Sequence, residues 1–89
     1  MSMEQALLND PVLSETEKRA IRHALWYFGD QATGMQPGSF TTNLLAAFGS
    51  ADAMNFRRLS NAFPSLGAAV FIIKNFDNGA ELLAGRVKP

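Results

Sequence analysis

The side chains that could do chemistry are few and lie far apart along the chain. His23 is the only histidine, and its neighbours at helical spacing are Arg19, Arg22 and Tyr27. A metal-ligand set or an acid–base pair needs a second suitable group, and this spacing supplies none. No serine or threonine has a base placed for it by spacing. We therefore expect a solvated surface histidine, no catalytic, cofactor-binding or metal-binding residue, and no enzyme activity.

The carboxylates have simpler explanations than catalysis. Glu15 and Glu17 follow Ser14 as in an S-x-x-E capping box, in which serine and glutamate bond the free N–H groups at the start of a helix. Asp52 sits where the helix dipole favours a negative charge. Asp30 and Asp77 follow expected helix ends, where short polar side chains commonly serve turns.

Trp26 is the least expected side chain. On a helical projection it falls on the polar face with Arg19 and Arg22, opposite the apolar stripe. Tryptophan and arginine are enriched at binding hot spots, so this face is one candidate surface for a partner. The alternative is structural: Met3 and Leu7 of the N-terminal segment would pack over the ring.

The segment 29–38, GDQATGMQPG, is the one long connection, and Met35 is its single bulky apolar residue. Long loops in compact domains are often functional, so Met35 joins the candidate partner-binding residues. A phosphate-binding loop is not expected, because the lysine after the glycine is absent and no strand precedes the segment. The sequence leaves open whether this loop is scaffold or site.

A helix-turn-helix that binds nucleic acid is the main competitor, with Arg57, Arg58 and Lys74 as its candidate contacts. The helix after the expected turn is apolar, whereas a recognition helix needs polar residues to read base edges. Lys plus Arg number 8 and Asp plus Glu number 8, so the chain lacks the basic surplus typical of such proteins. Nucleic acid is therefore not the expected partner.

Length and composition predict one domain, 1–89, with a packed core. The chain has 89 residues, is 47% hydrophobic and contains no cysteine, which excludes disulfides and cysteine-based zinc sites. Its longest apolar run, LGAAVFII, is far shorter than a membrane-spanning helix. The first residues carry acids where a secretory signal is basic. We expect a cytoplasmic protein with no membrane association.

The predicted fold is all-α: a compact bundle of four main short helices with helical turns at both ends. Serines precede three of these helices and are expected to cap them, while glycine, proline or Asn-Gly ends each one. Segments 1–10 and 80–89 either dock on the body or remain mobile. The four main helices are predicted at 14–28, 40–48, 51–63 and 66–77.

Apolar residues at three- and four-residue spacing define the expected core faces. In the first three helices they form one stripe each: Ile21, Leu25 and Phe28; Phe40, Leu44 and Phe48; Phe56, Leu59 and Phe63. The last helix is apolar nearly all round. Such a helix is either central or lies in a subunit interface, so a homodimer or larger homo-oligomer is one alternative.

The stretch from Trp26 to Pro64 resembles small uncharacterised helical proteins of actinobacteria and their phages. The resemblance rests on GDQATGMQPGSFT, LL-x-AF, AD-x-x-N and RL-x-x-AFP, which are turn, cap and apolar positions. It implies a short accessory protein, encoded by a phage or its host, that binds a host protein. It implies no catalytic residue.

These observations favour a non-enzymatic protein-interaction module. Its partner would be a host protein or a second copy of the chain. Two alternatives remain: a small nucleic-acid-binding regulator, and a structural or assembly component of a larger particle.

Overall fold

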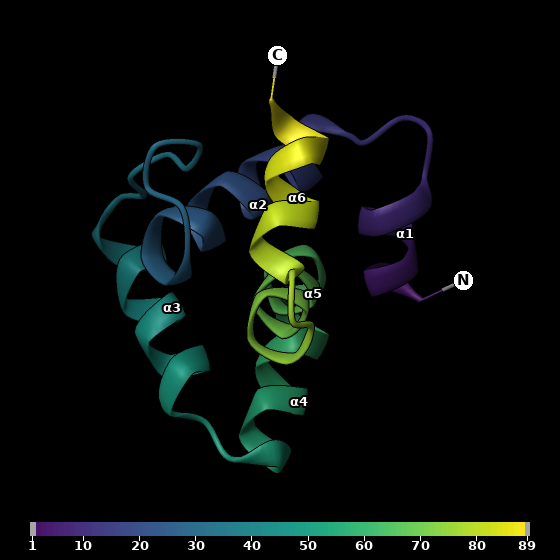
Figure 1. Ribbon diagram of the computed structural model, residues 1–89. Coiled ribbons are helices and arrows are strands. Elements are labelled where there is room, and N and C mark those ends of the chain that lie inside the picture. Colours follow the sequence, from purple (N-terminus) through teal and green to yellow (C-terminus); the bar gives the residue numbers. More distant parts are fainter. Residues whose placement is uncertain (1, 89) are drawn as a thin grey trace.

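Six helices make up the fold in the computed structural model, which describes residues 2–88 (Figure 1). That part of the chain contains no strand, so the all-α prediction is confirmed. Two terminal helices accompany the four main ones. The bounds are α1 Met3–Asn9, α2 Glu15–Phe28, α3 Ser39–Ser50, α4 Ala53–Ala62, α5 Pro64–Asn75 and α6 Gly79–Val87.

The first two helices begin at capping boxes, and the one at Ser14 is the box that the sequence predicts. The Ser14 hydroxyl accepts a hydrogen bond from the Glu17 N–H at 3.1 Å, and the Glu17 carboxylate accepts one from the Ser14 N–H at 2.8 Å. Ser2 and Gln5 make the same reciprocal pair at α1. Each box satisfies two backbone donors that the first turn would otherwise leave unpaired.

The three serine caps predicted farther along are wrong. Ser39 is the first residue of α3, after Gly38 as N-cap, and Ser65 lies inside α5. Ser50 ends α3 and donates to the carbonyls of Ala46 and Ala47. Serine can satisfy a helix start, but in a last turn its hydroxyl bonds the carbonyl three or four residues back instead.

The helix bounds shift accordingly. Asp52 caps α4 by accepting from the Asn55 N–H at 2.8 Å, so α3 continues through Gly49 and α4 begins at residue 53 instead of 51. Pro64 begins α5 two residues before the predicted start, because proline lacks only an N–H that the first turn does not use. Helix α5 then ends at Asn75, two residues before the predicted stop.

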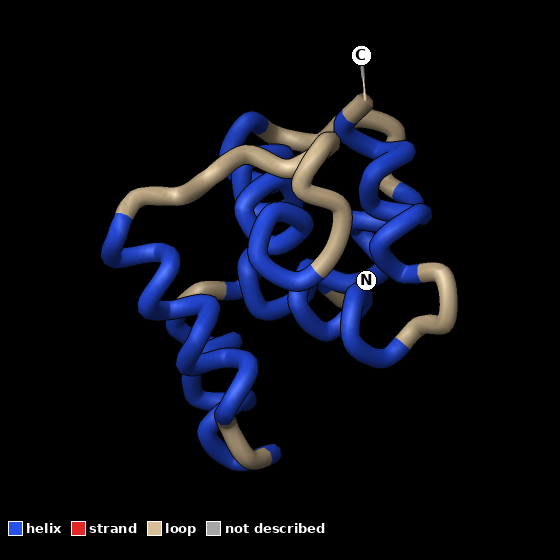
Figure 2. Tube along the Cα trace, turned by 60° about the vertical axis from the view of Figure 1, so that its left-hand side comes forward, coloured by secondary structure: helices blue, strands red, loops and turns tan. Residues whose placement is uncertain are grey.

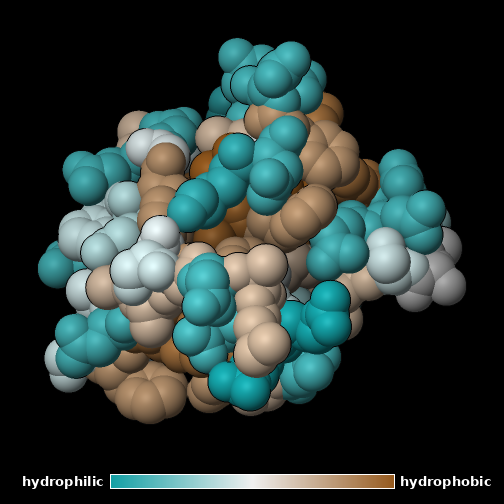
Figure 3. All heavy atoms as spheres, turned by 90° about the horizontal axis from the view of Figure 1, so that it is seen from below, coloured by the Kyte–Doolittle hydropathy of each residue, from teal (hydrophilic) through white to brown (hydrophobic). Residues whose placement is uncertain are grey.

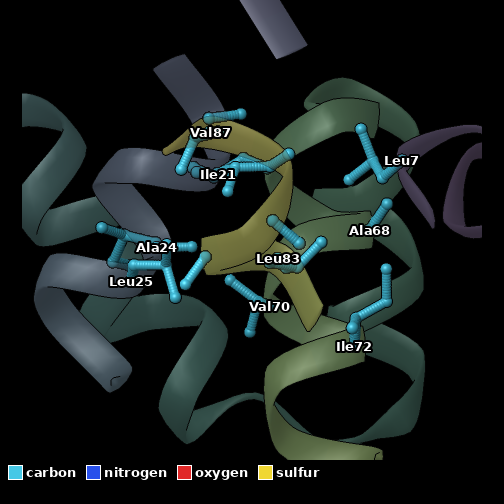
Figure 4. Packing of buried hydrophobic residues seen from close by; sticks show 14 of the residues in the cluster. Leu7, Ile21, Ala24, Leu25, Ala68, Val70, Ile72, Leu83 and Val87 are labelled. Atoms are coloured by element: carbon cyan, nitrogen blue, oxygen red, sulfur yellow. The ribbon is translucent and has the colours of Figure 1, made fainter. Parts of the chain in front are cut away.

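Helix α5 is the centre of the molecule, and α1, α2, α4 and α6 all contact it. Leu66 through Val70, together with Ile72, are buried. Figure 4 shows side chains of α2, α5 and α6 pointing into one shared interior, among them Leu25, Val70 and Leu83. Most of α5 is thus covered within a single chain, while the side chain of Phe71 remains 39% exposed. A subunit interface that includes α5 stays a prediction.

Both terminal segments are packed against this centre. Leu7 of α1 is fully buried, as is Leu83 of α6. The Arg86 guanidinium donates to the carbonyl of Asp10, which joins the last helix to the α1–α2 connection. Val87 is buried as well, so α6 is docked on the body through its last turn. Residue 89 lies outside the described residues.

Helices α3 and α4 form a hairpin that extends from the rest of the body (Figure 2). Leu45 and Phe48 hold α3 to the core, and both are fully buried. Phe40, predicted to be a core residue on the same stripe, is instead 68% exposed. The second half of α3 packs on the core, but its first turn does not. The apolar stripe of α3 is therefore longer than the surface that covers it.

Candidate interaction surface

The predicted Trp26 face is largely used within the protein. The Arg22 guanidinium donates to the Val87 carbonyl at 3.3 Å, at the end of α6. Trp26 is half-buried, and α1 packs on α5 and α6 instead of covering the ring with Met3 and Leu7. What approaches the Trp26 backbone is Gly34, from the 29–38 loop.

The loop is anchored at its start and in its middle. The Asp30 carboxylate accepts from the Thr33 hydroxyl at 2.6 Å and from the Ala32 N–H at 3.0 Å, and these bonds lower the pKa of Asp30, the hydroxyl bond most. The Met35 N–H donates to the Arg22 carbonyl at 3.0 Å. The Met35 side chain is 42% exposed. These contacts fix the loop backbone on α2 and leave Met35 a predicted partner-binding residue.

We expect Gly34→Ala to lower the free energy of unfolding by about 1–3 kcal/mol, the cost of overpacking. A Cβ at this position would lie 2.7 Å from the Trp26 Cα and 2.9 Å from the Arg22 carbonyl oxygen, and neither backbone atom can move aside cheaply. Urea denaturation measures the change. Gly38→Ala is the control, because a Cβ there meets nothing within 4 Å. Equal stability of the two variants would show that the loop does not rest on α2.

An apolar groove of about 300 Å³ borders another face of α2. Residues from four helices and the α4–α5 corner form its walls. Thr16, Ala20 and His23 come from α2, Phe40, Thr41 and Leu44 from α3, Ala62 and Phe63 from the end of α4, and Pro64, Ser65 and Leu66 from the start of α5.

Two aromatic rings stand at this groove. The Phe40 and Phe63 ring centroids are 6.2 Å apart, within the range of favourable tilted aromatic pairs. Phe40 is 68% exposed and Phe63 36%. Apolar side chains also reach the surface between polar ones on the face shown in Figure 3. Single exposed apolar side chains are normal on protein surfaces, so it is the apolar groove beside Phe40 that makes this face a candidate binding site.

His23 is a half-buried wall of the groove and not the solvated surface histidine predicted from the sequence. Burial lowers its pKa below the usual 6.5, and the nearby positive charge of Arg19 lowers it further. Arg19 is exposed, one helical turn before His23. Of the four predicted partner-binding residues, Arg19 alone therefore lies beside this groove. His23, which lines the groove, was not among the predicted residues.

The lowered pKa of His23 makes stability depend on pH. Folding favours the neutral imidazole, so its contribution is complete above pH 6.5 and is lost as the pH falls through the lower folded-state pKa. We expect the wild-type protein to lose stability relative to His23→Gln below about pH 6.5. Chemical denaturation of both proteins from pH 8 to pH 5 measures this. Parallel stability curves would contradict the burial of the imidazole.

The three residues proposed for nucleic acid are exposed, and two of them already make contacts within the chain. Arg57 and Arg58 are exposed on α4, and Arg58 donates to the Asn55 side chain at 3.3 Å. Lys74 on α5 donates to the Gly49 carbonyl at 3.3 Å and lies 5.7 Å above the centre of the Phe28 ring. Lys74 thus ties α5 to α2 and α3 through contacts within the chain.

No protein-family model, curated protein or solved structure matches the chain. Within residues 2–88, no helix has both the length and the apolar character needed to span a membrane. The same part of the chain contains no group of three or more histidine or acidic side chains placed to hold a metal ion.

Proposed function

We propose that this protein is a non-enzymatic protein-interaction module and that the groove beside Phe40 and Phe63 holds an apolar segment of its partner. The observation that carries the proposal is Phe40, which is 68% exposed at the mouth of an apolar groove while Phe48 in the same helix is fully buried. Burying such a ring in an interface removes a large apolar surface from water.

The partner's segment is best described as a helix. Every element that borders the groove is helical, and the described chain offers no sheet edge to which a peptide strand could be added. An amphipathic helix laid between other helices is a common recognition mode, in which side chains one turn apart enter a shared apolar groove. The resemblance to small phage and actinobacterial proteins favours a host protein in the cytoplasm as the source of this helix.

Affinity capture with paired variants tests the proposal. We expect Phe40→Ala to reduce capture of the partner from a lysate of the source organism at least about tenfold, as expected for a hot-spot aromatic. Stability should fall by about 1 kcal/mol or less, since the ring is mostly exposed. Met54→Ala is the control, because Met54 is 62% exposed on α4 but does not line the groove.

If both variants lose capture equally, or if neither loses it, the groove is not the binding site. Self-association is measured alongside by sedimentation. Dimerisation that Phe40→Ala abolishes would identify a second copy as the occupant.

A further inference from the structure

Among the described residues, His23 is the only titratable one that lines the groove. The rest of the lining is apolar or carries hydroxyl groups, and it holds no fixed charge. The imidazole is half-buried on α2, and the other walls come from α3, the end of α4 and the start of α5. The groove can therefore gain or lose a positive charge at this one position.

The three helices opposite His23 supply no counter-ion for a protonated imidazole. Helices α3, α4 and α5 contain no acidic residue. Asp52 precedes α4 as its N-cap and does not line the groove. The bases of these helices, Arg57, Arg58 and Lys74, do not line it either. An imidazolium in the groove would therefore face apolar and hydroxyl groups alone on this side.

Helix α2 itself supplies no counter-ion either. Its acids, Glu15 and Glu17, lie in the first turn and outside the groove lining. Tyr27, one turn after His23, offers a hydroxyl group but no carboxylate. The side-chain charge that acts on the imidazole is that of Arg19, one turn before it, and this charge has the same sign as the imidazolium. The surroundings of His23 thus favour its neutral form.

An apolar occupant of the groove would favour the neutral form further. It would remove water from the part of the imidazole that is still exposed, and burial without a counter-ion disfavours the charged form. Burial already lowers the pKa of His23 below 6.5 in the free protein, and Arg19 is the second cause. Because binding would lower this pKa again, linkage requires that protonation of His23 weakens binding by the same factor.

We propose that protonation of His23 releases the partner from the groove, so that the interaction is lost under mildly acidic conditions. This regulation rests on the function proposed for the groove. Affinity has its full value well above pH 6.5 and falls as the pH drops through the lower pKa of the free protein. Each further unit by which binding lowers the pKa weakens binding about tenfold at a pH below both values.

A helical probe without ionisable groups isolates the titration of the protein. Helices of 16 residues are selected on the wild-type protein at pH 8 from a displayed library. Their apolar face varies among Leu, Ile, Phe and Met, and the other positions carry only Ala, Gln and Ser. The best helix is synthesised with acetylated and amidated ends, which removes its terminal charges. Isothermal titration calorimetry then measures its Kd from pH 8 to pH 5.

We expect the wild-type Kd to rise about tenfold by pH 5, the change for one further unit of pKa lowering. His23→Gln should show no such rise, whatever its Kd at pH 8. Met54→Ala is the control that keeps the wild-type pH dependence, because Met54 is exposed and does not line the groove. Circular dichroism at pH 5 establishes that each protein is folded during the measurement.

NMR gives a readout that does not depend on any variant. His23 is the only histidine, so the imidazole resonances of the protein belong to it alone. We expect the bound protein to titrate at lower pH than the free protein. A pKa that binding leaves unchanged or raises, or a Kd that rises equally in wild type and His23→Gln, would overturn the regulation and leave the groove's function standing. A library that enriches no helix on wild type beyond Phe40→Ala would overturn both.

Discussion

Phe48→Ala is expected to lower the free energy of unfolding by about 3–5 kcal/mol, the range for truncation of a large core aromatic. Phe48 is fully buried, and its ring centroid lies 5.3 Å from that of Phe56 in an edge-on arrangement. The side chain therefore holds α3 to both α4 and the core. Its removal leaves a cavity where the last turn of α3 packs on α4 and the core.

Phe40→Ala is the matched control for this prediction, because it removes the same side chain from the same helix. Phe40 is 68% exposed, so its loss should cost about 1 kcal/mol or less. Thermal unfolding followed by circular dichroism measures both variants. A loss for Phe40→Ala as large as that for Phe48→Ala would mean that the hairpin packs along its whole length and that the groove is closed.

Gly79→Ala should have an effect of similar size, about 3 kcal/mol at the upper end of overpacking costs. Gly79 begins α6 against the backbone of α5. A Cβ at this position would collide with the Ile72 carbonyl oxygen and would lie 2.7 Å from its carbon and 3.0 Å from the Ile73 Cα. None of these is the end of a flexible side chain, so α6 would have to move away from α5.

Gly85→Ala in the same helix is the control, with the opposite sign. A Cβ there meets nothing within 4 Å, and alanine is favoured over glycine inside a helix by about 0.5–1 kcal/mol. Urea denaturation should therefore show one variant destabilised and the other slightly stabilised. Destabilisation by both would indicate a helix that cannot accept any added side chain, and it would contradict the specific contact of Gly79 with α5.

Local interactions explain what the sequence could predict of this fold. The Ser14 capping box and the Ile21–Leu25 face of α2 depend on residues three or four positions apart, and both are confirmed. The cap predicted at Ser50 failed because Ser50 and Asp52 both precede α4, and the sequence does not say which of the two caps that helix. Here the carboxylate of Asp52 caps α4.

The groove could not be predicted, because its walls come from residues far apart in the chain. The spacing of apolar residues places Phe40 and Phe48 on one face of α3. It does not show how far along the helix that face is covered by the rest of the protein. His23 and Phe63 are 40 positions apart in the sequence and line one hollow. The close approaches of Gly34 and Gly79 are likewise tertiary contacts, for which the local sequence pattern carries no signal.

The apolar character of α5 shows how one signal can have two explanations. A helix without a polar face must be covered, and the sequence allows either neighbours in the same chain or a second subunit. The structure supplies four neighbouring helices. These neighbours cover most of α5 and leave its Phe71 side chain 39% exposed, whereas Phe40 in the first turn of α3 is 68% exposed.

Site-specific photocrosslinking from position 40 tests the binding role of the groove most directly. p-Benzoylphenylalanine replaces Phe40 in one protein and Met54 in a second, and each is irradiated in cells of the source organism. Both positions are more than 60% exposed, so accessibility alone does not distinguish them. We predict one discrete crosslinked protein from position 40 and none from position 54. Equal crosslinking from both positions, or crosslinking from position 54 alone, would contradict the assignment of the groove as the binding site.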